Sequence, residues 1–345
     1  MNLYLFPEAA TSESGYGMCV ESDYSRLSPS AGDQVVWYTS FPKEKMPYLK
    51  EGDIILHWNK TLSAKSFDNI LRRRPRAEVN YKELSALSGK EFDRIHCDDV
   101  LFYHAVRKLF PEKEFAVRFH NCYSRIYDRS QLLDAGLDLK FRATLRLMFG
   151  LEKEIFQDRR VHKVFISEED RNYYVAMYGR RKDSEVWSFS PDMEIAGRNR
   201  TEPHYAGRVV WFGGVESHKK RSVDWFAYEV FPEILKQVPE AEFHLWGRNT
   251  AAYNHPEAHV FGHGFFEGEG LPLSPALYIN PDVIGGGVKL KLMHLIEDGT
   301  PCISTPFGFE GYSRDLADDR YCIVEEMDRW ADRIVSILKS DMPSC

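Results

Sequence analysis

The order of apolar and polar residues along the chain predicts short buried strands that alternate with helical stretches. In the second half, strand patterns at Val209–Phe212 and Glu242–Trp246 flank an amphipathic helical stretch that ends at a turn with Pro239. The first half carries six further strand patterns: Met1–Phe6, Val35–Tyr38, Ile54–His57, Arg94–His96, Phe115–His120 and Val164–Ile166. Strands and helices that alternate in this way predict an α/β protein with parallel sheets.

A long amphipathic pattern over Leu139–Phe156 predicts a helix with a broad apolar face and two basic residues, Arg142 and Arg146. Two interpretations are open. The apolar face packs against an internal core, or the helix lies on a membrane surface with its arginines toward lipid headgroups. The internal interpretation is favoured, because most helices with this pattern cover a core.

A run of three glycines, Gly285–Gly287, precedes a shorter helical pattern that ends at Gly299. Glycine at a strand-to-helix turn lets backbone N–H groups approach a ligand, and a helix N-terminus favours an anion. Lys291 and His294 lie three residues apart on one face of this helix. The opposite face is apolar, with Leu292, Leu295 and Ile296. A phosphate cradle with a lysine beside it is one interpretation, and a turn in which glycine serves only tight packing is the other.

The motifs around this turn follow the order seen in a known family. They are Trp225-Phe226, Phe231-Pro232, Gly247, Gly285–Gly287, Lys291, Gly299, Pro301, Ser304-Thr305, Gly308 and Glu310-Gly311. Over roughly 120 residues this pattern resembles the C-terminal half of GT-B-fold retaining glycosyltransferases of the family 4 type, also called glycosyl transferases group 1. Many members of that group build bacterial polysaccharides and lipid-linked glycans.

The resemblance implies the GT-B fold, an α/β architecture of two Rossmann-like doubly wound domains that face each other across a cleft. Residues 1–190 then form an acceptor-binding domain and residues 191–325 a nucleotide-sugar-binding domain, with the linker near 188–197. A C-terminal helix within residues 326–345 is expected to pack back on the N-terminal domain. A chain of 345 residues suits two domains of this size.

For catalysis, the resemblance implies that Lys291 and a basic residue of the segment HKKRS stabilise the departing diphosphate. Lys220 is assigned that second role, although Lys219 and Arg221 are alternatives. Glu310 matches a glutamate near the donor sugar. The donor-binding positions are Gly213, Gly214, Lys219, Gly247, Arg248, His263, Gly285, Gly286, Gly287 and His294.

His294 departs from the family pattern, which usually has a glutamate that holds the ribose hydroxyls. An imidazole makes one hydrogen bond to a hydroxyl, whereas a carboxylate accepts a bidentate pair. Glu297 is an alternative for this role.

In the first half, His120 follows a strand and matches a histidine that the family places near the donor sugar and the acceptor hydroxyl. Ligands gather at the carboxyl ends of strands in such sheets. Weaker acceptor-side candidates, chosen on that ground or from the first glycine-containing loop, are Gly15, Gly17, His57, Asp98 and Asp99.

The net charge of −7 argues against nucleic acid as a partner, because phosphate neutralisation requires a basic face. The segment LRRRPR, with Arg72, Arg73, Arg74 and Arg76, is a local exception. It contacts lipid headgroups or the pyrophosphate of an acceptor, or it is a solvated helix end stopped by Pro75. The six cysteines form no CxxC pair, and no secretion signal or spanning apolar run is evident. We therefore expect a cytoplasmic protein, with peripheral contact at the inner face of the membrane as a further possibility.

The expected activity is retaining transfer of a hexose from a nucleotide-diphosphate sugar, UDP-linked in the first instance, to a glycan, lipid-linked or protein acceptor. No cofactor is expected. Because the chain contains no Asp-x-Asp triplet, no metal is expected on the donor phosphates. Two alternatives remain: a non-catalytic subunit that partners an active homologue, and a sugar-nucleotide 2-epimerase on the same fold.

Overall fold

The computed structural model describes residues 1–7, 15–57, 69–132, 139–179, 182–189, 205, 207–215, 217–266, 271–316 and 321–340. The chain divides into two compact units. Unit 1 comprises Met1–Arg129 and Leu139–Phe189, and unit 2 comprises Ser130–Asp138 and Ser190–Cys345. Each unit is described by itself.

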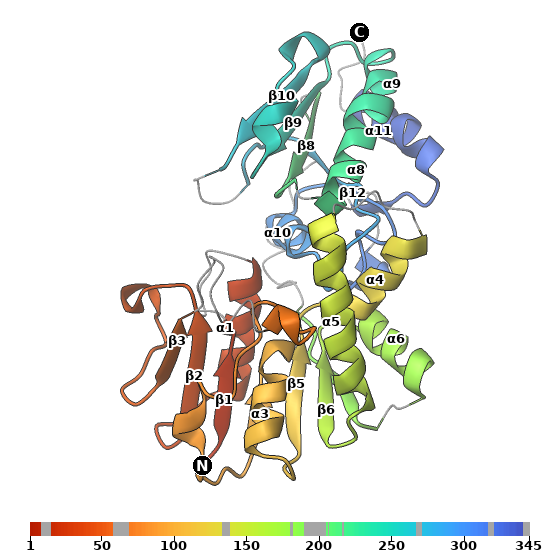
Figure 1. Ribbon diagram of the computed structural model, residues 1–345. Coiled ribbons are helices and arrows are strands. Elements are labelled where there is room, and N and C mark those ends of the chain that lie inside the picture. Colours follow the sequence, from red (N-terminus) through yellow and green to blue (C-terminus); the bar gives the residue numbers. More distant parts are fainter. Residues whose placement is uncertain are drawn as a thin grey trace. The chain divides into compact units, whose positions relative to one another are not determined.

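Unit 1 is built on a parallel sheet whose strand order is β3-β2-β1-β4-β5-β6-β7 (Figure 1). The strands are β1 (Leu3–Phe6), β2 (Gln34–Thr39), β3 (Ile54–His57), β4 (Ile95–Cys97), β5 (Phe115–Phe119), β6 (Val161–Phe165) and β7 (Ser184–Val186). The α-helices are α1 (Gly15–Leu27), α3 (Tyr103–Leu109), α4 (Tyr123–Leu132), α5 (Leu139–Gln157) and α6 (Glu168–Tyr178). Short 3-10 turns lie at η1 (Lys43–Lys45), η2 (Ser85–Leu87) and η3 (Val100–Phe102).

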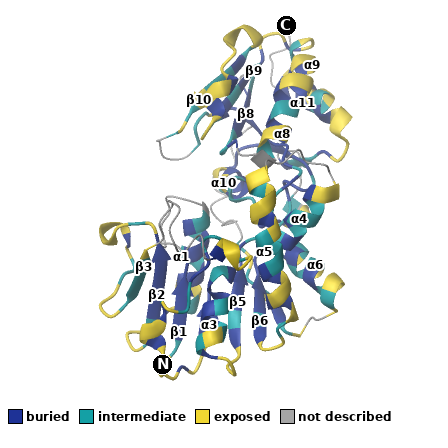
Figure 2. Ribbon diagram, viewed as in Figure 1, coloured by how far each residue is buried: buried dark blue, intermediate teal, exposed yellow. Residues whose placement is uncertain are grey.

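The six strands predicted in the first half are confirmed, each within three residues of its predicted ends. The central strands are buried almost throughout, as Figure 2 shows, because helices cover parallel sheets on both faces. Strand β7 has no counterpart in the predictions, since its three residues include a serine and a glutamate and show no apolar run.

Unit 2 repeats this architecture with the parallel order β10-β9-β8-β11-β12-β13. Its strands are β8 (Arg208–Phe212), β9 (Glu242–Trp246), β10 (Val260–Gly264), β11 (Leu277–Asn280), β12 (Cys302–Ser304) and β13 (Tyr321–Ile323). Its helices are α8 (Ser217–Trp225), the π-helical η4 (Phe226–Val230), α9 (Phe231–Leu235), α10 (Leu290–Asp298) and α11 (Trp330–Ser340). The 3-10 turns are η5 (Thr250–Tyr253), η6 (Pro256–Ala258), η7 (Arg314–Leu316) and η8 (Met327–Arg329).

Both sheets have a central point where the order of the strands reverses. It lies between β1 and β4 in unit 1 and between β8 and β11 in unit 2. This is the doubly wound Rossmann arrangement, in which ligands bind outside the carboxyl ends of the strands near the reversal. We therefore expect ligand-binding residues directly after β4 and β5 in unit 1 and after β8, β9 and β11 in unit 2.

Helix α11 packs on the hydrophobic core of unit 2. Trp330, Ile334 and Leu338 lie one turn apart along it and are buried in the hydrophobic core of unit 2. The Trp330 ring packs edge-on against Trp225, with 5.6 Å between ring centroids. These three side chains belong to the same hydrophobic core as the buried strand residues of unit 2, so the helix is part of that unit. Most of the predicted linker at 188–197 lies outside the described residues.

The predicted helix over Leu139–Phe156 is confirmed as α5, and its two halves have different surroundings. Leu145, Met148 and Ile155 are buried in unit 1, as the internal interpretation requires. The first turns are exposed, and Leu139 keeps 84% of its surface accessible.

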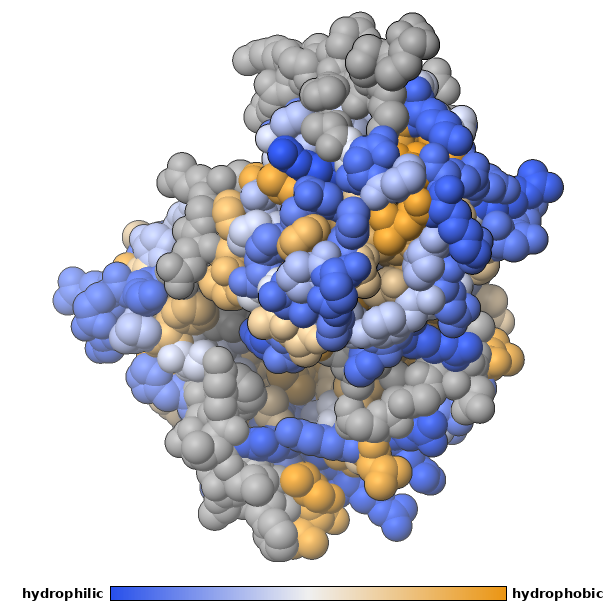
Figure 3. Space-filling model, turned by 90° about the horizontal axis from the view of Figure 1, so that it is seen from above, coloured by the Kyte–Doolittle hydropathy of each residue, from blue (hydrophilic) through white to orange (hydrophobic). Residues whose placement is uncertain are grey.

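Within the described part of the chain, no helix is both long enough and apolar enough to cross a membrane. On the face shown in Figure 3, apolar side chains occur in small groups among hydrophilic ones.

Candidate functional site

Two glycine turns meet at the carboxyl edge of the unit 2 sheet. Gly213 follows β8 with a φ of +139°, and Gly247 follows β9 with a φ of +127°. The Gly213 N–H donates to the Trp246 carbonyl at 2.8 Å. A Cβ atom at position 247 would lie 2.1 Å from the Gly213 carbonyl oxygen. Both the backbone angle and the close approach therefore require glycine at position 247.

These turns form part of a pocket of about 370 Å³, which we call the unit 2 pocket. Five of the predicted donor-binding residues line it: Gly213, Gly214, Gly247, Arg248 and His294. Its other lining residues are Phe212, Trp246, Phe265, Phe266 and Pro272. Chain positions about eighty residues apart are thus brought together by the reversal in strand order.

Four aromatic side chains line the unit 2 pocket: Phe212, Trp246, Phe265 and Phe266. The Trp246 and His263 rings stack with 4.0 Å between centroids, although His263 itself does not line the pocket. His263 Nε2 also lies 2.9 Å from Nδ1 of His244. Burial and the neighbouring His244 lower the pKa of His263, which favours its neutral ring. Sequence reasoning missed the aromatic lining, although a tryptophan directly before Gly247 was a signal for it.

The predicted glycine turn before α10 is present. Gly285 and Gly287 have φ angles of +145° and +61°, which glycine adopts without strain. The Lys289 ammonium donates to the carbonyls of Gly286 and Gly287, at 3.3 and 3.0 Å. Helix α10 then ends at Gly299, which has a φ of +73°. Leu292, Leu295 and Ile296 are buried, as predicted.

Lys291 forms an ion pair that the sequence analysis did not foresee. Its Nζ donates to Oδ2 of Asp282 at 3.0 Å, and the Asp282 carboxylate is almost completely buried. Burial opposes the charge on Asp282, but Lys291 and Lys219 outweigh it and hold the pKa of this carboxyl below its usual value. Burial also lowers the pKa of Lys291 despite the attraction of Asp282. The available signal was an acidic residue just after the apolar strand β11.

The two lysines of HKKRS have different surroundings. Lys220 is exposed and pairs with Asp224 one helical turn away. Lys219 is half-buried, and its charge acts on both Asp282 and Lys291. The segment forms the start of α8, because no glycine or proline interrupts the helix after Gly214. Of the two lysines, Lys219 is therefore the one whose charge acts on Lys291.

Glu310 lies in the turn that follows β12. Its backbone N–H donates to the Phe307 carbonyl at 3.2 Å, and its side chain is half-buried. The same turn packs on the segment before α10, since the Tyr312 hydroxyl donates to the Lys289 carbonyl at 2.9 Å. The Tyr312 hydrogen bond therefore holds the turn that carries Glu310 against the start of α10.

In unit 1, polar residues gather at the carboxyl ends of β4 and β5 and form what we call the carboxyl-edge cluster. The cluster comprises Tyr16, His96, Asp98, Asp99 and His120. His120 Nε2 lies 2.8 Å from the Asp98 carbonyl oxygen and 3.2 Å from Asp98 Oδ2. His96 Nε2 lies 3.3 Å from Asp98 Oδ1. The Tyr16 hydroxyl donates to Asp99 Oδ2 at 2.5 Å, and its ring packs edge-on against His120.

The carboxyl-edge cluster holds His120 in its charged form. Burial alone would lower the pKa of His120, but the Asp98 carboxylate outweighs burial and raises it to about 10. Burial also opposes the charge on Asp98, whereas His120 and His96 lower the pKa of that carboxyl. At neutral pH the two residues therefore form a buried imidazolium–carboxylate pair.

The five weaker acceptor-side candidates lie at different places in unit 1. Gly15 and Gly17 lie in the first turn of α1, the helix that carries Tyr16. His57 is the last residue of β3 and is exposed, outside the carboxyl-edge cluster. Asp98 and Asp99 belong to the cluster, and Asp99 also caps η3 by accepting from the Leu101 N–H at 2.8 Å.

One group among the described residues has ligand atoms close enough together for a metal ion, and it consists of Asp23, Asp98 and His120. Arg118 Nε donates to Asp23 at 2.7 Å, and His120 is protonated against Asp98. Cations of the protein thus already neutralise both carboxylates. This donor set fits an internal ion-pair network better than a metal site.

The pair of His120 and Asp98 predicts a pH-dependent stability. Its other charged or titratable neighbours among the described residues are Tyr16, Cys19, Asp23, His96, Asp99 and Arg118. A raised histidine pKa stabilises the folded state fully below pH 6.5, and that contribution is lost as the pH rises through about 10. We expect His120→Gln to lower the free energy of unfolding by about 3–5 kcal/mol at pH 6.5, because it removes the positive charge beside the buried Asp98 carboxylate and leaves only His96 next to it. The difference should shrink toward pH 10 in urea unfolding.

The control for this experiment is His162→Gln, because His162 pairs with Glu185 but is 40% exposed. Its effect should stay within a few tenths of a kcal/mol across the same pH range. A difference between wild type and His120→Gln that does not change between pH 6.5 and 10 would contradict the charged state assigned to His120.

Comparisons with known proteins agree on the fold. No family model matches the chain, and no curated protein matches it. The solved structure of WaaG, a glycosyltransferase involved in lipopolysaccharide biosynthesis, has a TM-score of 0.62 and 11% identity, over 98% of this chain and 90% of WaaG.

Two further structures have the same TM-score. Sucrose-phosphate synthase from Thermosynechococcus elongatus is 15% identical, over 99% of this chain and 90% of that enzyme. TarM is 10% identical, over 99% of this chain and 92% of its own. With its two Rossmann-like units, the chain has the GT-B fold of these glycosyltransferases.

Proposed function

We propose that this protein is a glycosyltransferase that moves a sugar from a nucleotide-diphosphate donor to a glycan, lipid-linked or protein acceptor with retention of configuration. The observation that carries the proposal is the unit 2 pocket, which aromatic side chains and two glycine turns line at the carboxyl edge of the sheet. The fold shared with the structures above agrees with it.

The aromatic side chains that line the pocket can stack on a nucleobase. Bases stack on aromatic faces, and the Trp246 ring is already stacked on His263 and met edge-on by Phe266 at 5.7 Å. His294 lines the same pocket from α10. It supplies one hydrogen bond to a ribose hydroxyl, the role that the family usually gives to a carboxylate.

The diphosphate is assigned to the lysines beside the glycine turn. When the sugar departs, negative charge grows on the diphosphate, and fixed cations aimed at it lower the barrier. Lys291 supplies such a charge, and its hydrogen bond to the Asp282 carboxylate positions the ammonium group. Lys219 adds a second positive charge to the same region. This arrangement needs no metal ion or cofactor.

On the acceptor side, the charged state of His120 decides its role. An imidazolium donates a hydrogen bond and offers positive charge, but it does not accept the proton of an acceptor hydroxyl. In retaining transfer the acceptor oxygen forms a bond to the sugar carbon while the bond to the diphosphate breaks. We assign the released proton to an oxygen of the leaving diphosphate, with His120 as an electrostatic and hydrogen-bonding group.

The test is a panel of nucleotide sugars without added metal, starting with UDP-sugars and including GDP-sugars. Thermal unfolding and slow donor hydrolysis are followed together, because a ligand that binds only the folded state raises the melting temperature. Stabilisation together with hydrolysis by one donor supports the transferase and names its nucleotide. If no donor binds at millimolar concentration, the proposal fails and the non-catalytic partner subunit becomes the better explanation.

Trp246→Ala should weaken the binding of the donor found in this way by roughly 5- to 150-fold, as expected for the loss of about 1–3 kcal/mol of base stacking. Isothermal titration calorimetry measures the change. The control is Tyr228→Ala, which removes an exposed aromatic ring of unit 2 that does not line the pocket. Equal affinity of Trp246→Ala and wild type would place the base elsewhere.

A further inference from the structure

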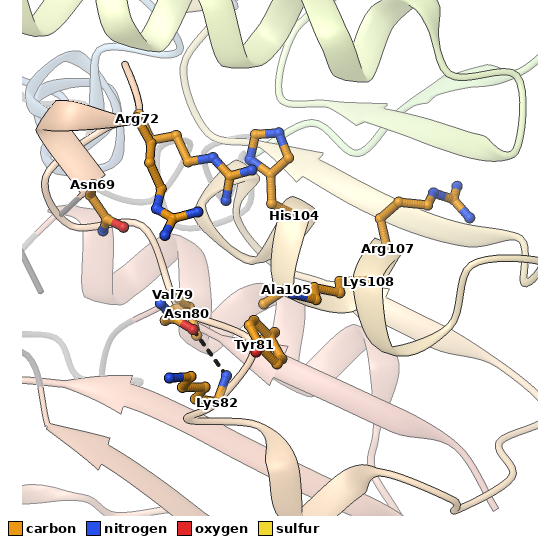
Figure 4. Close-up of a pocket in the computed structure, with 11 residues that line it drawn as sticks. Asn69, Arg72, Val79, Asn80, Tyr81, Lys82, His104, Ala105, Arg107 and Lys108 are labelled. Carbon is orange, nitrogen blue, oxygen red and sulfur yellow. Dashed lines mark hydrogen bonds between the residues drawn. The ribbon is translucent and has the colours of Figure 1, made fainter.

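A second pocket lies in unit 1, between the chain segment 69–82 and helix α3 (Figure 4). Its volume is about 440 Å³, and it shares no lining residue with the carboxyl-edge cluster. Basic side chains dominate its lining: Arg72, Arg74, Lys82, His104, Arg107 and Lys108. We call it the basic pocket. None of its described lining residues is acidic.

The LRRRPR segment reaches the basic pocket through a tight turn. The N–H groups of Arg73 and Arg74 donate to the carbonyls of Ile70 and Asn69, at 2.9 and 2.8 Å. Arg73 has a φ of +58°, in the left-handed region where glycine is favoured. The chain therefore reverses direction at an arginine, and Arg72 and Arg74 on either side of it both line the pocket.

Carboxylates neutralise one part of the basic pocket. Buried Glu78 contacts His104 Nδ1 at 2.5 Å and Arg74 at 3.7 Å, and Glu154 contacts His104 Nε2 at 2.8 Å. Burial lowers the pKa of His104, but Glu78 and Glu154 outweigh it and raise the pKa above its usual value. Arg107 points away from the other labelled side chains in Figure 4 and pairs with Asp158 at 2.8 Å.

The remaining part of the pocket carries positive charge that these carboxylates do not reach. Lys82 and Lys108 are both exposed, and within the described residues no ion pair is found for either one. The Lys108 ammonium lies 3.5 Å from the centroid of the Tyr81 ring, which orients it. The Asn80 side chain accepts from the Lys82 N–H at 3.0 Å and shapes the turn between them (Figure 4).

We propose that the basic pocket binds a phosphate ester. Lysines act as point charges for phosphate oxygens and arginines offer paired N–H donors, so a pocket with both suits an anion with several oxygens. A volume of about 440 Å³ exceeds the size of a phosphate group and leaves room for part of the esterified group. The proposal is independent of the donor site in unit 2.

Two sources of a phosphate ester fit this chemistry. One is a soluble phosphorylated molecule. The other is a lipid headgroup, for which the neighbouring Ile70 and Leu71 are relevant, since 42% and 69% of their surfaces are exposed directly before Arg72. Apolar side chains beside basic ones are typical of surfaces that contact a lipid interface. The experiment distinguishes the sources.

The test uses the full chain without a nucleotide sugar. Binding of glycerol 3-phosphate is measured by calorimetry, and binding to vesicles of phosphatidylcholine with about one fifth phosphatidic acid by co-sedimentation. The pocket variant is Lys82→Gln/Lys108→Gln, and the matched control is Lys43→Gln/Lys45→Gln, which removes the same charge from exposed positions of unit 1. We expect the pocket variant to bind at least about tenfold more weakly and the control to bind like wild type.

Binding of glycerol 3-phosphate that is lost in the pocket variant assigns a soluble ester. Loss confined to the vesicles assigns a lipid phosphate, in which case Leu71→Ser should also weaken vesicle binding. No binding of either probe overturns the proposal, and so does equal binding by the pocket variant and the control. Loss in Lys291→Met instead of the pocket variant would also overturn it, because the anion would then occupy the unit 2 site. A failed transferase assay leaves these outcomes unchanged.

Discussion

Lys291→Met is expected to reduce turnover of the nucleotide-sugar donor by about a thousandfold while the unit 2 pocket remains formed. The physical reason is that Lys291 is a largely buried cation near the glycine turn, where an electrostatic interaction with a growing negative charge is strong. Removing a single preorganised donor of this kind typically costs 10²–10³ in rate. The measurement is donor hydrolysis or transfer at saturating donor, with the binding constant determined separately.

Lys291→Met is also expected to be less stable than wild type, so lost activity could reflect unfolding. A second substitution, at Asp282, separates the two effects. Lys291→Met leaves the Asp282 carboxylate buried without its partner, which costs about 3–5 kcal/mol. In Asp282→Asn/Lys291→Met both charges are absent, so most of that stability should return while turnover stays low. Asp282→Asn alone keeps the lysine charge and loses only its positioning, so it should retain more activity than either Lys291 variant.

These three variants separate catalysis from folding. If the double variant regains activity together with stability, Lys291 has only a structural role and the assignment of the diphosphate is wrong. If Asp282→Asn is as inactive as Lys291→Met, the carboxylate takes part in the reaction more directly than the ion pair indicates.

Gly247→Ala has the largest expected effect on the fold of unit 2. The new Cβ would lie 2.1 Å from the Gly213 carbonyl oxygen and 2.7 Å from its carbon, both of which belong to the backbone. The position also has a φ of +127°, which side chains rarely adopt. We expect a loss of more than about 3 kcal/mol in the free energy of unfolding. Urea unfolding of the purified variant measures it.

Gly264→Ala is the matched control, because that glycine has a φ of +81° but no atom within 4 Å of the added Cβ. It isolates the backbone strain, which costs about 1–3 kcal/mol. Donor binding should disappear in Gly247→Ala, since the turn lines the unit 2 pocket. Similar stability of the two variants would mean that the glycine turns are not packed as closely as the structure has them.

For the lysines of HKKRS, the sequence predicted the basic segment but not which lysine acts near the glycine turn. A basic segment after the first strand of unit 2 was recognised from the sequence, together with the lysine of α10. Which basic side chain faces Lys291 depends on the rotation of α8 against the sheet, and packing sets that rotation. Lys219 acts on Asp282, whereas Lys220, one residue later, is exposed and paired with Asp224.

The Asp282 ion pair and the aromatic lining of the unit 2 pocket could not be predicted from local sequence patterns either. Lys291 and Asp282 lie nine residues apart, across a glycine turn whose path no periodicity describes. Trp246 and His294 come from chain positions that only the strand order brings to one pocket. Likewise, the basic pocket joins LRRRPR to α3, whereas the sequence alone favoured a solvated helix end as the explanation of its arginines.

The sequence by itself determined the alternation of strands and helices, the glycine positions of the turns and the GT-B fold, because each depends on local periodicity, local backbone angles or the order of motifs along the chain. Only the tertiary structure decided that α11 belongs to unit 2 and that two separate pockets exist. It alone also showed that Asp98 raises the pKa of His120 and that Lys291 forms an ion pair with Asp282. These features depend on contacts between residues distant in sequence, and the free energy of such contacts comes from burial and charge pairing that no single segment contains.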